Sequence, residues 1–163
     1  MGPAHWMDGR ILELQNRRET YILVSIKGME GSTMSVEIGM KGRAETVVTP
    51  DNTARAAGSG LSPVFATPWM VALMENAAVQ AVQGALAEDQ GTVGTHLDIS
   101  HDAASPIGMK VWAEAEVTAV EGRKLTFDVA AYDEAGRIGG GTHQRFIIQP
   151  DRFLAKVQEK LNK

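Results

Sequence analysis

Residues 63–88 have the sequence PVFATPWMVALMENAAVQAVQGALAE, and Glu75 is the only charged side chain between Arg55 and Glu88. The pair Thr67-Pro68 predicts a helix start, because proline suits the first helical position and the extended residue before it suits the N-cap. A helix from Pro68 to about Ala87 would be about 30 Å long. Its apolar and small residues lie on nearly every side, which indicates that other structure encloses it.

Glu75 is therefore the most informative residue of this segment. An ionised carboxylate is costly to remove from water, so on such a helix it must find partners or take up a proton. A carboxylate in that position can act as a general base or as a nucleophile. The alternative is that Glu75 points to solvent from an ordinary helix.

The remainder of the chain is dominated by strand patterns. A β-rich run over 44–49 ends at Pro50-Asp51, and residues 51–62 are small and are predicted to form a loop. After the helix, apolar and polar residues alternate over 95–99, 111–119, 125–131 and 138–148, with turns at 121–122 and 133–136. Pro150-Asp151 opens a short C-terminal helix with an apolar stripe that contains Val157 and Leu161 and either Phe153 or Leu154.

The order is thus one strand, one long helix and four strands, which we predict to form a meander. This predicts an α+β protein of the hotdog type, in which an antiparallel sheet wraps around one long central helix and a short helix follows at the C-terminus. A single such layer leaves strand edges exposed and the helix half covered. We therefore expect a homodimer or a dimer of dimers.

Length and composition limit the classes of function. The 163 residues predict one hotdog domain over residues 34–163, preceded by a loosely attached extension over residues 1–33. A net charge of −4 and the absence of a basic cluster argue against nucleic-acid binding. With no cysteine there is no disulfide and no thiolate metal site, and we expect no metal and no cofactor. No signal peptide or membrane span is evident, so the cytoplasm is the expected location.

Three residues are the candidates for catalysis, and they carry a family resemblance. Thr67 is followed eight positions later by Glu75 and a further 26 positions later by His101. This spacing, with the segments VFATPWMVALMENA (64–77), VGTHLDISHDAASPIG (93–108) and GGGTHQRFII (139–148), resembles the fluoroacetyl-CoA thioesterase group of hotdog enzymes over residues 34–161.

The resemblance implies hydrolysis of an acyl-CoA, with a coenzyme A thioester as substrate. Glu75 would activate water or attack the thioester directly, His101 would orient or protonate groups, and Thr67 would donate a hydrogen bond. It also implies that Gly94 and Arg145 help to hold the acyl-CoA, with Arg145 suited to a phosphate.

Helix geometry adds a constraint on these residues. Thr67 and Glu75 would lie about 12 Å apart along one straight helix, so they cannot share a hydrogen bond within it. If both act at one site, that site lies across the interface between two chains.

Each candidate also has a purely structural interpretation. Thr67 could be only an N-cap, His101 a turn residue and Arg145 a solvated charge. Trp69 is expected at the pocket wall or in the core, and His96 and His143 are expected to be structural or surface groups. The three glycines 139–141 could hold phosphate or allow a close approach of backbone.

Two departures from the family pattern bear on function. Pro68 replaces a glycine and has no N–H, so the Trp69 N–H or the Thr67 hydroxyl would have to serve the oxyanion. The loop 51–62 contains no phenylalanine, whereas the family has a phenylalanine-bearing lid, which predicts an acyl group other than fluoroacetyl. Two competing functions are a non-catalytic acyl-CoA or acyl-carrier binding module and a hydratase, although the hydratase motif is absent from the sequence.

Overall fold

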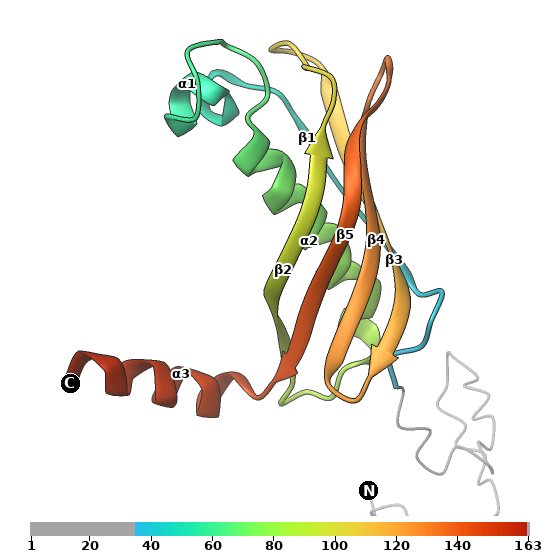
Figure 1. Cartoon of the computed structure of the whole chain (residues 1–163), viewed down its shortest axis with the longest axis vertical. Coiled ribbons are helices and arrows are strands. Elements are labelled where there is room, and N and C mark those ends of the chain that lie inside the picture. The colour runs from blue at the N-terminus through green and yellow to red at the C-terminus, as the bar shows by residue number, and fades with distance from the viewer. Residues whose placement is uncertain (1–34, 163) are drawn as a thin grey trace, which may run out of the picture. The chain divides into compact units, whose positions relative to one another are not determined.

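A computed structural model describes residues 35–162, which form an antiparallel sheet of five strands against one long helix (Figure 1). The helix is α2 (Thr67–Val82), and the strands are β1 (Lys41–Val47), β2 (Gly91–His101), β3 (Lys110–Glu121), β4 (Lys124–Asp133) and β5 (Gly136–Ile148). The predicted α+β hotdog architecture is confirmed. The predicted extension over residues 1–33 lies outside the described residues.

The order of the strands differs from the predicted meander. Across the sheet the order is β1-β3-β4-β5-β2, so only β3, β4 and β5 form a meander. Tight turns join these three strands, whereas residues 102–109 form a longer connection that carries the chain from the edge strand β2 past β5 and β4 to β3. On its way this connection packs beside the start of α2, where the Phe65 N–H donates to the Ser105 carbonyl at 2.9 Å. The strand β2 is therefore an edge strand with β5 as its neighbour.

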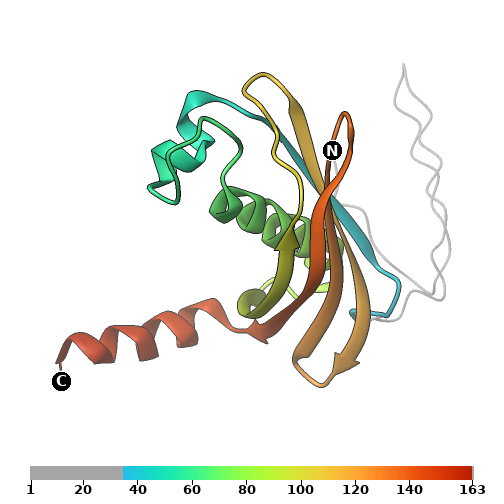
Figure 2. The same cartoon turned by 45° about the horizontal axis from the view of Figure 1, so that its top comes forward.

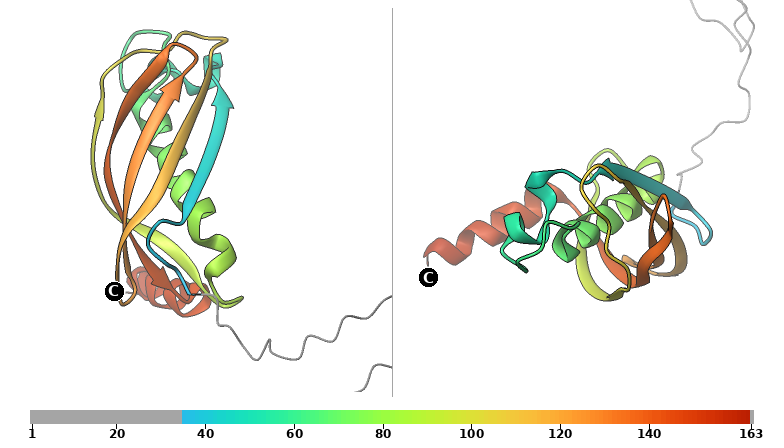
Figure 3. Two further views of the ribbon diagram at one scale, coloured as in Figure 1. Left: turned by 90° about the vertical axis from the view of Figure 1, so that its right-hand side faces the viewer. Right: turned by 90° about the horizontal axis from the view of Figure 1, so that it is seen from above.

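The core lies between the sheet and one face of α2. Figure 3 shows the strands curving around the helix on one side. The helix buries small and methionine side chains against the sheet, namely Met70, Met74, Ala77, Ala78, Ala81 and Val82. The alternating strands supply the opposite wall, with Val111, Ala113, Val117, Leu125, Phe127 and Ala131 fully buried. The other face of α2 is open in the single chain, where Trp69 is 48% exposed.

Gly42 brings β1 close to the helix. A Cβ atom at Gly42 would collide with the main-chain carbonyl of Ala77 and the main-chain nitrogen of Ala81. The absent side chain and the small residues of α2 thus allow strand and helix backbones to pack directly against each other.

The ends of α2 differ from the prediction. Ala66 is the N-cap residue, and Thr67 is the first residue of the helix, so the hydroxyl of Thr67 does not cap it. At the other end the α-helix stops at Val82, and a 3₁₀ turn, η2 (Gln83–Ala85), replaces its last part. Gly84 in this turn is a poor helix former, which accounts for the early end.

The predicted loop 51–62 has short helices instead. It contains η1 (Pro50–Asn52) and α1 (Ala54–Ala57). The Thr53 hydroxyl accepts a hydrogen bond from the Ala56 N–H at the start of α1, and Gly58 ends α1 with a positive φ of 68°. Figure 2 shows this segment beyond the first turn of α2. Its residues Ala54 and Ser59 line the cavity described below. Small residues therefore build a capped structure over 50–57, and residues 58–62 form a loop as predicted.

The chain ends in α3 (Pro150–Gln158) and a 3₁₀ turn, η3 (Glu159–Asn162), which confirms the predicted C-terminal helix. The helix leads away from the sheet in Figures 1 and 3, and none of its residues is buried. Its predicted apolar stripe is accordingly exposed. Within residues 35–162, every helix is too short or too polar to cross a bilayer.

Candidate active site

The first turn of α2 and the end of β2 bring two of the predicted residues together. The Thr67 Oγ1 lies 2.7 Å from the His101 Nδ1, a hydrogen-bond distance. Thr67 is therefore not the N-cap that was the alternative, and His101 is the last residue of a strand, not a turn residue. We call these two residues the Thr67–His101 pair.

A small cavity adjoins this pair. Its volume is about 250 Å³, and α1, the segment before α2 and the connection after β2 line it with Ala54, Ser59, Val64, Phe65, Thr67, His101, Asp102, Ala103 and Ala104. The His101 Nε2 is buried and has no hydrogen-bond partner within the described residues. Buried polar atoms are nearly always satisfied, so this nitrogen calls for a partner from water or a ligand.

Glu75 lies two helical turns farther along α2, in a different set of contacts. Its Oε1 is 3.6 Å from the Arg145 Nη1 and 3.9 Å from the His143 Nε2. A Cβ atom at Gly94 would collide with the same carboxylate oxygen. The Glu75 side chain is 37% exposed, so the carboxylate is partnered but still reachable. We call Glu75, Gly94, His143 and Arg145 the Glu75 cluster.

Arg145 holds this cluster together from β5. It is 6% exposed, so the interpretation as a solvated surface charge is wrong. Its Nε donates to the Thr92 hydroxyl at 2.8 Å, and its Nη2 donates to the Thr92 carbonyl at 3.0 Å. Burial lowers the pKa of Arg145, and the charge of Glu75 opposes that shift. A guanidinium stays protonated in proteins, so Arg145 supplies a fixed positive charge beside Glu75.

His143 is fully buried and packs against the Phe127 ring, with ring centroids 6.1 Å apart. Burial is the largest influence on its pKa and lowers it, so the imidazole is neutral at pH 7. Its contact with Glu75 is consequently not an ion pair. The predicted structural role of His143 is confirmed by this burial, and the alternative surface role is wrong, whereas His96 is exposed.

The Thr67–His101 pair and the Glu75 cluster are separate in one chain. Residues eight positions apart on a straight helix are about 12 Å apart along its axis. The structure therefore gives each chain two groups of functional side chains, and neither contains all three predicted catalytic residues.

The remaining predicted residues have clear positions. Trp69 is half-exposed in the first turn of α2, so it does not lie in the core, and its place at the pocket wall stays a prediction. The close-approach interpretation of residues 139–141 fits the structure, because a Cβ atom at Gly139 or Gly141 would collide with a carbonyl of β2. The role of Arg145 on a CoA phosphate stays a prediction, and in this structure Thr92 and His143 accept hydrogen bonds from three of its nitrogen atoms.

Sequence reasoning missed the contributions of Thr92 and His143. The sequence does contain a signal for His143. Residues two positions apart on a strand lie on the same face, so His143 is predicted to lie beside Arg145. Which residues that face meets depends on the pairing of β5 with β2, where Gly94 lies opposite Arg145. The sequence pattern does not reveal that register.

The five-stranded sheet around α2 defines the class as a hotdog protein. Residues 48–151 match the family described as fluoroacetyl-CoA-specific thioesterase (FlK). This match covers more than half of the chain, and the protein belongs to that family.

Individual relatives agree with this assignment. The fluoroacetyl-CoA thioesterase of Streptantibioticus cattleyicolor is 45% identical over 97 residues, which is 60% of this chain and 70% of that protein. A solved structure of the fluoroacetyl-CoA thioesterase FlK is 38% identical, covers 77% of this chain and 98% of its own, and superposes with a TM-score of 0.73. A Thermus thermophilus thioesterase superfamily member is 30% identical over 77% of this chain and 96% of its own, with a TM-score of 0.70.

Proposed function

We propose that this protein is a thioesterase that hydrolyses an acyl-CoA to a free acid and coenzyme A. The observation that carries the proposal is the placement of Glu75, the single acidic residue of α2, with its carboxylate 3.6 Å from the buried Arg145 guanidinium. The named activities of the relatives support the same reaction. Glu75, Thr67 and His101 are the proposed catalytic residues.

The proposed reaction begins with addition to the thioester carbonyl and ends with cleavage of the carbon–sulfur bond. Glu75 either takes a proton from the attacking water or attacks the carbonyl itself to form a mixed anhydride that water then opens. His101 is proposed to orient or protonate groups in this sequence. The unpartnered Nε2 of His101 supports that role, because a ligand or water atom can satisfy it.

The start of α2 is the proposed binding site for the oxyanion. Main-chain N–H groups in the first turn of a helix have no partner within the helix and can stabilise negative charge. Pro68 has no N–H, so the N–H groups of Thr67 and Trp69 are the ones that remain there. Gly94 and Trp69 are proposed to contact the acyl-CoA. Arg145 is proposed to contact it as well, through the N–H groups that a bound substrate can reach.

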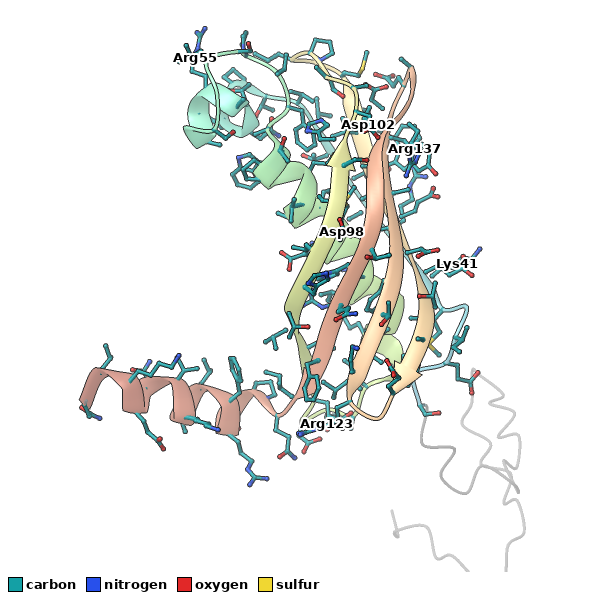
Figure 4. All side chains as sticks on the ribbon, viewed as in Figure 1. Lys41, Arg55, Asp98, Asp102, Arg123 and Arg137 are labelled. Atoms are coloured by element: carbon teal, nitrogen blue, oxygen red, sulfur yellow. The ribbon has the colours of Figure 1, made fainter. Side chains whose placement is uncertain are left out.

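We propose that the complete site forms between two copies of the chain. The strand β2 is the natural contact, because it is an edge strand and residues 94–98 in its middle are exposed. Exposed edges favour pairing with another strand. Figure 4 labels Asp98 partway along this edge and Asp102 just beyond its end.

Antiparallel pairing of two β2 strands would join the two sets of side chains. With a two-fold axis between Leu97 and Asp98, His101 of one copy lies opposite Gly94 of the other, since both are equally far from the axis along the strand. The Thr67–His101 pair of one copy would then approach the Glu75 cluster of the other. The proposed assembly is a homodimer, or a pair of such dimers, with two active sites per dimer.

The cavity beside the Thr67–His101 pair is the proposed acyl pocket. Its volume of about 250 Å³ lies below the roughly 300–1,000 Å³ typical of pockets for drug-sized ligands, which favours a short acyl group. The side chains around it are mainly small and apolar. Because α1 supplies part of the wall and contains no phenylalanine, we propose an acyl group other than fluoroacetyl.

The competing function is a non-catalytic acyl-CoA or acyl-carrier binding module, which the missing N–H of Pro68 favours. A panel of acyl-CoAs of increasing chain length, with a thiol reagent to detect free coenzyme A, distinguishes the two. We expect release of coenzyme A by the native protein and a loss of about 100-fold or more in Glu75→Gln, because the base or nucleophile is gone.

Glu121→Gln serves as the matched control, because this exposed glutamate pairs only with Lys124 on the β3–β4 hairpin among the described residues. It should hydrolyse the same acyl-CoAs at the native rate. Tight binding of acyl-CoA without any release by the native protein would support the binding module instead.

A further inference from the structure

The guanidinium of Arg145 is held on two sides by residues that do not touch the acyl-CoA in the proposed reaction. We propose that Thr92 and His143 are positioning residues that keep Arg145 beside Glu75 but prevent a two-point salt bridge between them. Glu75 then has a neighbouring positive charge and two carboxylate oxygens that remain free to react. This inference depends on the proposed function for its catalytic meaning, but its structural part is independent of that function.

The distances around Arg145 carry the proposal. Thr92 on β2 accepts hydrogen bonds from Nε at 2.8 Å and from Nη2 at 3.0 Å, so it occupies one edge of the guanidinium. On the other side the Nη1 lies 3.1 Å from the His143 Nε2. The distance from Nη1 to the Glu75 Oε1 is longer, at 3.6 Å, and exceeds the usual range of about 2.7–3.2 Å for a direct hydrogen bond.

His143 can act as an acceptor only in one protonation state. Its Nδ1 lies 2.8 Å from the His96 carbonyl, which can only accept, so the Nδ1 carries the proton and donates it. The Nε2 of the neutral ring then has a lone pair for the Arg145 Nη1. The burial of His143 favours this neutral form. Arg145 favours it too, because its guanidinium would repel a positively charged imidazole.

The consequence for Glu75 follows from the strength of charged pairs. Two parallel N–H bonds from an arginine to a carboxylate form a strong and well-ordered contact that occupies both oxygens. A glutamate bound in that way would be a poor base and a poor nucleophile. Contact with one nitrogen at a longer distance stabilises the negative charge while leaving the oxygens accessible.

Few charged groups act on Glu75 within the described part of the chain. Arg145 and His143 approach it from β5 within 4 Å. His96 of β2 is a further titratable residue whose charge influences His143. Beyond Glu75 itself, α2 contributes no charged side chain. A change in the response of Glu75 to pH can therefore be traced to the position of Arg145.

The test compares His143→Leu, Thr92→Val and His143→Gln with the native full chain. The pH titration of the Glu75 carboxyl is followed by ¹³C NMR, with the signal assigned by its absence in Glu75→Gln. In His143→Leu the Nη1 loses its acceptor and turns to Glu75, so the titration midpoint should fall by about half a pH unit or more, since a closer opposite charge favours the ionised form. Thr92→Val should shift it in the same direction by a smaller amount, because the Thr92 carbonyl remains.

His143→Gln provides the rescue, because its side-chain oxygen can accept the hydrogen bond from Arg145. Its midpoint should return toward the native value. Thr118→Val is the matched control for Thr92→Val, since it removes an exposed threonine hydroxyl on β3 that donates to the Thr126 carbonyl of the neighbouring strand at 3.3 Å and does not bond to Arg145. It should leave the midpoint unchanged.

Acyl-CoA hydrolysis gives the second readout. In His143→Leu we expect kcat to fall about tenfold with little change in KM, and the acid limb of the rate profile to move to lower pH. If the native protein releases no coenzyme A, the proposed function fails, and the NMR titration still decides this inference. A midpoint that stays at the native value or rises in folded His143→Leu and Thr92→Val would overturn it.

Discussion

Gly94 shows most directly how one residue sets the geometry of the site. It lies opposite Arg145 in the pairing of β2 with β5, and the absent side chain leaves the space that the Glu75 carboxylate fills. The position of the Glu75 carboxylate thus depends on a residue with no functional group. A side chain at this position would force the carboxylate away from Arg145.

This leads to a prediction for Gly94→Ala. The added methyl group collides with the Glu75 Oε1, so we expect kcat/KM for acyl-CoA hydrolysis to fall about tenfold or more, because small displacements of catalytic groups are costly. The rate is measured by release of coenzyme A.

Gly91→Ala on the same strand is the control. A Cβ atom there meets only the Pro150 ring at 3.4 Å, an ordinary contact, so its activity should stay near the native value. Equal activity of the two variants would show that the position of Glu75 does not depend on the space at Gly94.

At the scale of elements, the fit between β1 and α2 fixes how far the sheet wraps the helix. The contact at Gly42 is between two backbones and therefore cannot relax by rotation of a side chain. It sets the position of the helix relative to the sheet, and so of Thr67 and Glu75 relative to the strands.

We therefore predict that Gly42→Ala strongly destabilises the fold. Forcing a methyl group into a packed interior costs typically about 1–3 kcal/mol, and the collision here is with main-chain atoms, so we expect the upper end of that range or more. The free energy of unfolding is measured by urea denaturation.

Gly84→Ala is the comparison for this variant. It lies in the 3₁₀ turn after α2 with open space around it and no positive φ, so it should be neutral or stabilising by up to about 1 kcal/mol. If Gly42→Ala proves as stable as Gly84→Ala, the backbones of β1 and α2 are not in the close contact described.

The elements were predictable to different degrees. The strands β3, β4 and β5 follow from alternation and tight turns, which are local signals. The place of β2 does not follow from local signals, because its partner β5 comes two strands later in the chain. The spacing of Thr67 and His101 is visible in the sequence and indicated a site. The contacts of Thr92 and His143 with Arg145 were not predictable, because they depend on the register between β2 and β5.

At the scale of the whole molecule, each chain has two groups of side chains and neither is complete. The Thr67–His101 pair lies at the start of α2, and the Glu75 cluster lies two turns farther along it. The open face of α2 and the exposed edge of β2 adjoin both groups. The proposed second copy, paired along β2, would cover the exposed edge and complete the site.

We therefore propose that Thr67 of one chain works with Glu75 of another, and complementation between two variants tests this arrangement. The chains Thr67→Ala and Glu75→Ala, each inactive alone, are given different affinity tags, exchanged, and purified through both tags as heterodimers. One site of such a dimer contains both native residues and the other contains both substitutions.

We expect the purified heterodimer to recover roughly half of the native activity per dimer, because one of its two symmetry-related sites is intact. A heterodimer of the native chain and the double variant Thr67→Ala/Glu75→Ala, with one substituted residue in each site, should be inactive. Purified heterodimers of the two single variants that remain inactive, or an active dimer of native and double-variant chains, would contradict a site shared between two chains.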